Sequence, residues 1–172
     1  PDYARGAVMY QIFPDRFAKH GDCDLSEKLQ PFTVHADWSE LPRSGADAEG
    51  NWNNDFFGGN FNGIREKLPY LQGLGVKMLY LNPIFKAFSN HRYDTADYKK
   101  IDEMLGTETD FKALCKKAHR LGIKIILDGV FSHTGSDSVY FDSEGRFGGG
   151  ALSDPDSPYR KWYDFKKYLR KL

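Results

Sequence analysis

Three short apolar runs, each stopped by a turn-forming or charged residue, divide the first part of the chain. The runs are residues 7–13 before Pro14, residues 76–81 before Asn82-Pro83, and residues 123–127 before Asp128. Their length and their aliphatic and β-branched content predict strands. The third run shows almost no polar alternation, which is typical of a parallel strand that is buried on both faces.

Two segments between these runs carry apolar residues at helical spacing. Asn62 is the expected N-cap of the first helix and Gly75 its stop. The second begins with Thr107 and Asp110, which have the spacing of a capping box, and ends at Gly122. The apolar positions are Ile64, Leu68, Leu71 and Leu74 in the first helix, and Phe111, Leu114, Cys115, Ala118 and Leu121 in the second. We expect Cys115 to lie in the core.

Strands that alternate with helices through short turns predict a parallel sheet and an α/β fold. Residues 14–60 are polar, show no clear period, and are long for a connection, so we expect a functional or ligand-stabilised loop. Residues 89–98 are expected to form a polar loop. Residues 134–172, which include a run of three glycines, predict an excursion away from the sheet.

The composition is that of an ordinary globular domain of 172 residues, 40% apolar and 28% charged, with a net charge of zero. No basic patch favours nucleic acid as a partner, and no run is apolar for long enough to span a bilayer. Two cysteines do not form a disulfide framework. The high aromatic content, 15%, suits sugar rings and protein cores equally well. Nothing here indicates an organic cofactor, and the cellular compartment is left open.

The end of the third apolar run is the first candidate site. Asp128 directly follows the run, and His133 comes five residues later. Parallel α/β folds place their chemistry at the carboxyl ends of strands, so this pair predicts a site. An Asp that only caps a loop, beside a surface histidine, is the alternative.

Five stretches, in order, resemble conserved segments of the α-amylase superfamily of glycoside hydrolases. They are VMYQIFPDRF (8–17), FFGGNFNGI (56–64), LYLNPIF (79–85), SNHRYDTADYKKID (89–102) and DGVFSH (128–133). The residues in these five stretches are most similar to those of the neopullulanase, cyclomaltodextrinase and amylopullulanase branch. The resemblance implies a (β/α)₈ barrel with a domain inserted after the third strand. A full barrel needs about 250 residues, so we expect a partial TIM barrel of about three βα units in residues 1–133 and the start of the inserted domain in residues 134–172.

The family's retaining mechanism requires a carboxylate nucleophile and a carboxylic acid from the fourth and fifth strands. We expect the family's Arg-x-Asp nucleophile motif, which continues as Arg-x-Asp-x-x-x-His, to be absent from this chain. We therefore expect a fragment of a retaining hydrolase of α-1,4 and α-1,6 glucosidic bonds in starch, pullulan or cyclodextrins that is inactive alone. The alternative is a non-catalytic carbohydrate-binding or self-assembling module.

The resemblance assigns sugar-positioning roles to residues that are present. It implies that Tyr93 stacks on the sugar ring at the cleavage site, and that His91 and His133 form hydrogen bonds with hydroxyls of the same sugar. Asp128 is expected to act in support, by orienting partners that lie on later strands of the barrel. A core role for Tyr93 and a structural role for Asp128 remain alternatives, and for Asp94 we favour the structural role.

The family resemblance also implies calcium sites. The residues concerned here are Asp22, Asp24, Gly58 and Asn60, although Asn60 replaces an expected aspartate and Ser132 replaces an asparagine that often binds calcium at the inserted domain. Both changes weaken the donor set, and a solvated acidic loop is the alternative. Three strands taken from a barrel expose two sheet edges and an apolar face, so we also expect the chain to self-associate.

Overall fold

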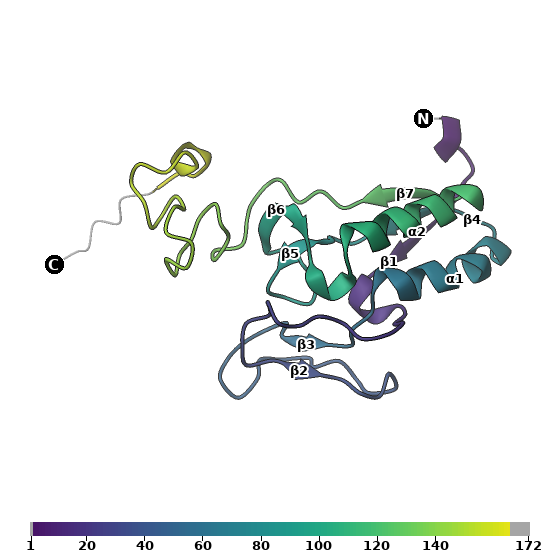
Figure 1. Cartoon of the computed structure of the whole chain (residues 1–172), viewed down its shortest axis with the longest axis horizontal. Coiled ribbons are helices and arrows are strands. Elements are labelled where there is room, and N and C mark those ends of the chain that lie inside the picture. The colour runs from purple at the N-terminus through teal and green to yellow at the C-terminus, as the bar shows by residue number, and fades with distance from the viewer. Residues whose placement is uncertain (1, 166–172) are drawn as a thin grey trace.

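The computed structural model describes residues 2–165, and its centre is a three-stranded parallel sheet (Figure 1). The strands are β1 (Val8–Ile12), β4 (Val76–Leu81) and β7 (Lys124–Leu127), in spatial order β1-β4-β7. Ile12 pairs with Leu81, which pairs with Leu127, so all three strands end at the same level. Three parallel strands in chain order, joined by helices, confirm the predicted first units of a barrel.

Helix α1 (Phe61–Gly73) starts two residues earlier than the sequence predicts. Its N-cap is Asn60, whose Oδ1 accepts a hydrogen bond of 2.8 Å from the Gly63 amide. The predicted cap, Asn62, instead lies in the first turn and donates to Asp110 Oδ1. Leu74 is the C-cap and is exposed, so it does not continue the buried face.

Helix α2 (Glu108–Arg120) begins with the predicted capping box. The Thr107 hydroxyl accepts from the Asp110 amide, and the Asp110 carboxylate accepts from the Thr107 amide at 2.9 Å. Leu114 and Ala118 are fully buried, whereas Cys115 is half-buried, so the core position expected for this cysteine is wrong. It lies at the margin of the apolar face.

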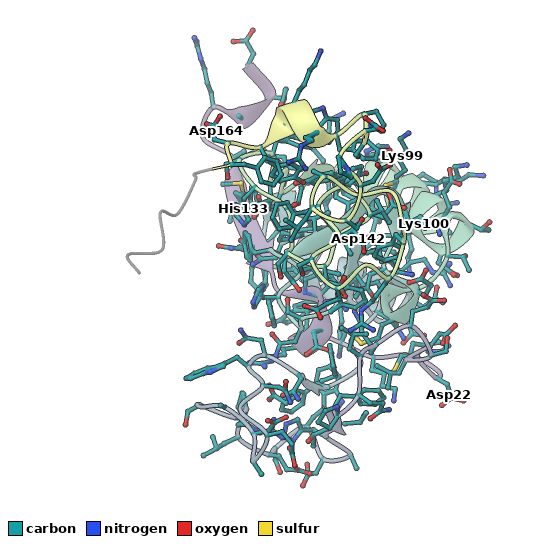
Figure 2. All side chains as sticks on the ribbon, turned by 90° about the vertical axis from the view of Figure 1, so that its left-hand side faces the viewer. Asp22, Lys99, Lys100, His133, Asp142 and Asp164 are labelled. Atoms are coloured by element: carbon teal, nitrogen blue, oxygen red, sulfur yellow. The ribbon has the colours of Figure 1, made fainter. Side chains whose placement is uncertain are left out.

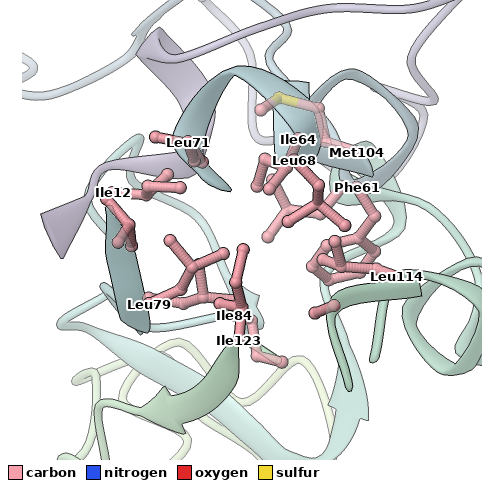
Figure 3. Packing of buried hydrophobic residues seen from close by; sticks show 14 of the residues in the cluster. Ile12, Phe61, Ile64, Leu68, Leu71, Leu79, Ile84, Met104, Leu114 and Ile123 are labelled. Carbon is pink, nitrogen blue, oxygen red and sulfur yellow. The ribbon is translucent and has the colours of Figure 1, made fainter. Parts of the chain in front are cut away.

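The main core lies between the sheet and helices α1 and α2 (Figure 3). Its fully buried side chains come from both layers: Ile12, Val76, Leu79, Leu81 and Ile123 on the sheet side, and Phe61, Ile64, Leu68, Leu71, Leu114 and Ala118 from the helices. Burial of this apolar surface is what holds the βα units together. Five of the residues predicted for the helix faces are among them.

The sequence predicted that strand β7 is buried on both faces, and this prediction is wrong. Ile125 and Ile126 are half-buried, and 38% of Leu127 is exposed. In residues 2–165 no strand pairs with the outer edge of β7, and only one sheet face is covered by helices. The opposite face carries Met9, 53% exposed, beside Tyr80 and Ile126, which are half-buried. This apolar face is the inner wall of a barrel sheet.

Residues 89–94 form a loop, as the sequence predicted, but residues 95–98 of the predicted loop belong to a strand of a β-hairpin. Strand β5 (Phe85–Ala87) pairs antiparallel with β6 (Thr95–Ile101), and the short helix η3 (Glu103–Leu105) follows. Polar residues dominate β6, so the hydrophobic pattern gave no strand signal there.

The long segment 14–60 is ordered by polar contacts around two short strands. These are β2 (Thr33–Val34) and β3 (Asp55–Phe56), which pair in parallel beneath the main sheet (Figure 1), after the short helix η2 (Pro14–Arg16). His35 stacks on Phe57 at 4.2 Å between ring centroids. Its Nδ1 lies 2.8 Å from Glu40 Oε2, and its Nε2 lies 3.2 Å from Asp55 Oδ2.

We expect the contacts of His35 to stabilise the fold more in mild acid than at higher pH. The Glu40 hydrogen bond, opposed by burial and reinforced by Asp55, raises the pKa of His35. A raised folded-state pKa gives stability that is present below the unfolded value of about 6.5 and is lost as the pH rises through the folded value. We expect His35→Gln to lose up to about 1 kcal/mol more at pH 6 than at pH 8.5. Urea unfolding at both pH values checks this, and an equal loss at both would contradict it.

Residues 134–165 extend away from the sheet and contain one short helix, η4 (Arg160–Trp162) (Figure 1). Aromatic contacts tie this segment to the hairpin: the Tyr98 ring stacks on Tyr140 at 5.5 Å, and Tyr140 stacks on Trp162 at 5.3 Å. The division of the chain between residues 133 and 134 stays a prediction, and the last part of the second segment, 166–172, lies outside the described residues. Within residues 2–165, no helix has both the length and the apolar character needed to cross a membrane.

Candidate functional site

The candidate site begins where the three parallel strands end. The backbone ladder continues one residue beyond each strand: the Asn82 amide donates to Ile12 O, and the Asp128 amide donates to Leu81 O, both at 3.0 Å. Gln11, on β1, donates from Nε2 to Asn82 Oδ1 at 2.8 Å. Three polar side chains, one from each strand or its end, therefore line one edge of the sheet, where parallel α/β folds hold ligands.

Tyr93 joins this edge from the loop between β5 and β6. Its hydroxyl donates to Asp128 Oδ2 at 2.7 Å and accepts a weaker bond of 3.4 Å from Asn82 Nδ2. Burial, together with the Asp128 carboxylate, raises the pKa of Tyr93 to about 12. The tyrosine is therefore neutral and is held by its hydroxyl, while its ring remains half-exposed. These contacts join two predicted site residues, Tyr93 and Asp128.

His91 lies next to Tyr93 on the same loop. The two rings are 5.8 Å apart and tilted by 39°. The Tyr93 amide donates to His91 Nδ1 at 3.0 Å, and Ser89 Oγ lies 3.1 Å from the same nitrogen. Burial, with Arg92 on the same loop, lowers the pKa of His91 against the opposing effect of Asp94. The structure thus places a mainly neutral imidazole beside the half-exposed tyrosine ring.

His133 is placed elsewhere. It is exposed, its Nδ1 lies 3.1 Å from Ser132 Oγ, and its carbonyl accepts from the Tyr98 hydroxyl at 2.6 Å. Figure 2 shows it beside the excursion of residues 134–165. Within the described residues, no hydrogen bond joins His133 to Tyr93, His91 or Asp128. It lines a largely apolar cavity of about 970 Å³ between that excursion and the hairpin.

Two of the residues predicted for calcium, Asn60 and Asp24, use a side-chain oxygen in local turns. Asn60 Oδ1 accepts from Gly63 and His20 amides, and Asp24 Oδ1 accepts from the Ser26 amide. Within residues 2–165, no three His, Cys, Asp or Glu side chains are arranged to hold a metal ion. The donor oxygens are thus engaged in backbone turns, and calcium binding stays a prediction without support from the geometry.

A buried ion cluster behind the site was missed by sequence reasoning. Asp102, 1% exposed, lies between two buried cations: Arg92 Nε at 2.9 Å and the Lys28 ammonium. Burial favours protonation of this carboxyl, yet Arg92 and Lys28 hold the pKa of Asp102 below its usual value. Lys28 also donates to Ala87 O, and Arg92 to Asn90 O. The cluster therefore fixes the long segment 14–60, the hairpin and the site loop to one another.

The expected absence of Arg-x-Asp is wrong for the short pattern, which occurs once, at Arg92-Tyr93-Asp94. Tyr98 stands where the nucleophile stretch of the family would continue with histidine. Arg92 is fully buried in the ion cluster, and Asp94 accepts hydrogen bonds from Ser89. Both side chains have structural contacts, so this triplet does not supply a nucleophile.

The fold and the site together define the front of a parallel βα barrel with a polar edge at its strand ends. Among solved structures, the type III pullulan hydrolase from Thermococcus kodakarensis matches with a TM-score of 0.75 at 32% identity, over 97% of this chain and 29% of that one. A cyclic α-maltosyl-(1→6)-maltose hydrolase from Arthrobacter globiformis, in complex with maltose, matches with a TM-score of 0.74 at 37% identity, over 98% and 34%.

The family described as Alpha amylase, catalytic domain, matches residues 11–171, and this chain belongs to it. An amylopullulanase from Thermoanaerobacterium saccharolyticum is 51% identical over 94% of this chain and 14% of that protein. The intracellular maltogenic amylase of Bacillus subtilis (strain 168) is 40% identical over 98% of this chain and 25% of that protein. The chain thus spans between a seventh and a quarter of these two curated relatives, and its relatives are glycoside hydrolases.

Proposed function

We propose that this chain is the sugar-positioning front of a retaining α-glucan hydrolase, acting on α-1,4 and α-1,6 bonds of starch, pullulan or cyclodextrin. The single observation that carries the proposal is the hydroxyl-to-carboxylate bond of Tyr93 and Asp128 at the strand ends. Relatives named amylopullulanase, neopullulanase and cyclomaltodextrinase support the substrate class.

In this proposal Tyr93 is the stacking platform. The bond to Asp128 fixes its hydroxyl, and the half-exposed ring offers a flat apolar face to the apolar face of a glucose ring. His91 donates a hydrogen bond to a hydroxyl of that glucose. Such bonds gain strength as the ring flattens toward an oxocarbenium-like transition state.

The same proposal leaves bond cleavage to residues that this chain does not supply. A retaining glycosidase needs two carboxyl groups about 5–5.5 Å apart. The Asp128 carboxylate instead accepts a hydrogen bond from the Tyr93 hydroxyl. We therefore expect binding of α-glucan without hydrolysis, with His133 brought to the sugar only in a longer barrel.

Self-association of the chain also stays a prediction. Val8 and Met9 are each 53% exposed on the first strand, and Phe131 is 77% exposed beyond the third. Exposed apolar side chains of this size beside open sheet edges favour association between copies.

Titration with β-cyclodextrin tests the proposed function. We expect Tyr93→Ala to weaken binding about threefold to tenfold, because the stacking ring is lost, and Tyr93→Phe to weaken it less. Tyr70→Ala removes an exposed tyrosine from α1 and serves as the matched control. Isothermal calorimetry measures the dissociation constants, and a reducing-sugar assay runs beside it.

Two results would contradict the proposal. The first is equal affinity in Tyr93→Ala and the unaltered chain. The second is reducing-sugar release above that of a heat-killed blank, which would mean that a catalytic pair is present after all.

A further inference from the structure

The loop that carries His91 and Tyr93 is closed by a pair of side chains, Ser89 and Asp94. The Ser89 amide donates to Asp94 Oδ2 at 3.1 Å, and the Ser89 hydroxyl donates to Asp94 Oδ1. The Arg92 amide in turn donates to Ser89 Oγ at 3.1 Å. Ser89 is 8% exposed. This arrangement, here called the Ser89–Asp94 clasp, ties the two ends of the loop together.

Inside the clasp, the contacts of the His91 ring determine where its proton lies. The Tyr93 N–H points at Nδ1 from 3.0 Å, so Nδ1 must present a lone pair. A neutral imidazole with an accepting Nδ1 carries its proton on Nε2. Ser89 Oγ also lies 3.1 Å from Nδ1, but its proton is directed at Asp94, so the Tyr93 amide is the donor to this nitrogen. Within residues 2–165, no hydrogen bond of the ring involves Nε2. The Nε2–H donor is therefore left for a ligand.

The charges around the ring come from the same loop. Asp94 Oδ1 lies 4.0 Å from Nδ1 and favours a protonated ring, whereas burial and the Arg92 guanidinium disfavour it. Protonation at Nδ1 would also break the bond from the Tyr93 amide. The same carboxylate accepts two hydrogen bonds from Ser89, through which it also holds the loop.

We propose that Ser89 and Asp94 are positioning residues: by closing the loop they keep the Tyr93 amide against His91 Nδ1, which leaves Nε2–H to donate to a hydroxyl of a bound glucose unit. The identity of the ligand rests on the proposed function, whereas the clasp and the proton position are tested without any ligand. The role differs from plain loop stability because it fixes which nitrogen of the His91 ring faces the sugar. The His91 and Tyr93 ring centroids are 5.8 Å apart.

Long-range ¹H–¹⁵N NMR of histidine-labelled protein at pH 7 tests the proton position directly. In the unaltered chain we expect a single species for His91, with Nδ1 unprotonated and Nε2 protonated, and slow exchange of the Tyr93 amide. Ser89→Ala should speed that exchange and weaken β-cyclodextrin binding, each about threefold to tenfold, as for the loss of one or two hydrogen bonds. Asp94→Asn keeps the side-chain volume, loses one acceptor, and should shift both in the same direction.

Ser39→Ala is the matched control, since Ser39 makes a similar serine–aspartate turn with Asp37 far from His91 in the sequence. A proton on Nδ1 in the unaltered chain would overturn the proposal. So would unchanged Tyr93 exchange and sugar affinity in both clasp variants. If the unaltered chain binds no sugar while the NMR results are as expected, the proposed function fails, and with it the ligand role of His91.

Discussion

Replacing Asp102 with asparagine is expected to lower the free energy of unfolding by about 3–5 kcal/mol. The substitution removes the one carboxylate between two buried cations, Arg92 and Lys28. Arg92 has no exposed surface and Lys28 is 7% exposed, so neither charge can turn to water without moving the backbone. Urea unfolding followed by circular dichroism measures the loss.

The matched control for this prediction is an ion pair in solvent. Glu108 pairs with Lys112 one turn along α2 at 2.7 Å, and both side chains are more than 70% exposed. We expect Glu108→Gln to leave the free energy of unfolding nearly unchanged, because solvent screens this exposed pair. A second variant, Lys28→Met, leaves Arg92 and Asp102 as a one-to-one pair and should cost less than Asp102→Asn. Equal losses at Asp102 and Glu108 would show that the buried cluster does not stabilise the fold.

Gly63→Ala is expected to destabilise the chain by about 2–3 kcal/mol, although alanine usually favours a helix. Gly63 lies in the first turn of α1, against the backbone of residues 18 and 19. A β-carbon there would lie 2.2 Å from the Ala18 carbonyl oxygen, which already accepts a hydrogen bond from the Asn60 amide. Backbone atoms on both sides must move to admit a methyl group.

The same helix offers a control of opposite sign. Gly73 lies in the last turn of α1, and a β-carbon added there would meet no neighbouring atom within 4 Å. Gly73→Ala should therefore stabilise the protein by about 0.5–1 kcal/mol through helix propensity and reduced entropy of the unfolded chain. Thermal unfolding of the two variants side by side checks the pair, and a loss of similar size in both would contradict the steric argument at Gly63.

The sheet and its two helices were predictable because their signals are local. Apolar runs, a capping box at Thr107 and a glycine stop at Gly122 are each read within a few residues. Strand β7 was misjudged because its burial depends on neighbouring strands, not on its own pattern. The β5–β6 hairpin was missed because polar side chains on β6 hide the strand period.

The site was predictable only in part, because only some of its contacts join residues that are close in the sequence. Asp128 follows a strand, so its position at the sheet edge could be inferred, and the family resemblance pointed to Tyr93. Asp102 joins Lys28, 74 residues earlier, to Arg92, and no spacing pattern announces such a cluster. Gln11 and Asn82 complete the polar edge of the sheet. In the sequence, Gln11 resembles any residue inside a strand, and Asn82 resembles a residue that only ends one.

The match between strand order and chain order has a consequence for synthesis on the ribosome. Strand β4 pairs with β1, and β7 pairs with β4, so each new strand of this sheet docks on one that has already been synthesised. The segment that connects the two strands is complete by then. Asn82 meets Gln11 as soon as the second strand docks, and Asp128 meets Tyr93 when the third does. The sugar-facing edge is thus expected to assemble vectorially, from the first strand to the third, as the nascent chain emerges.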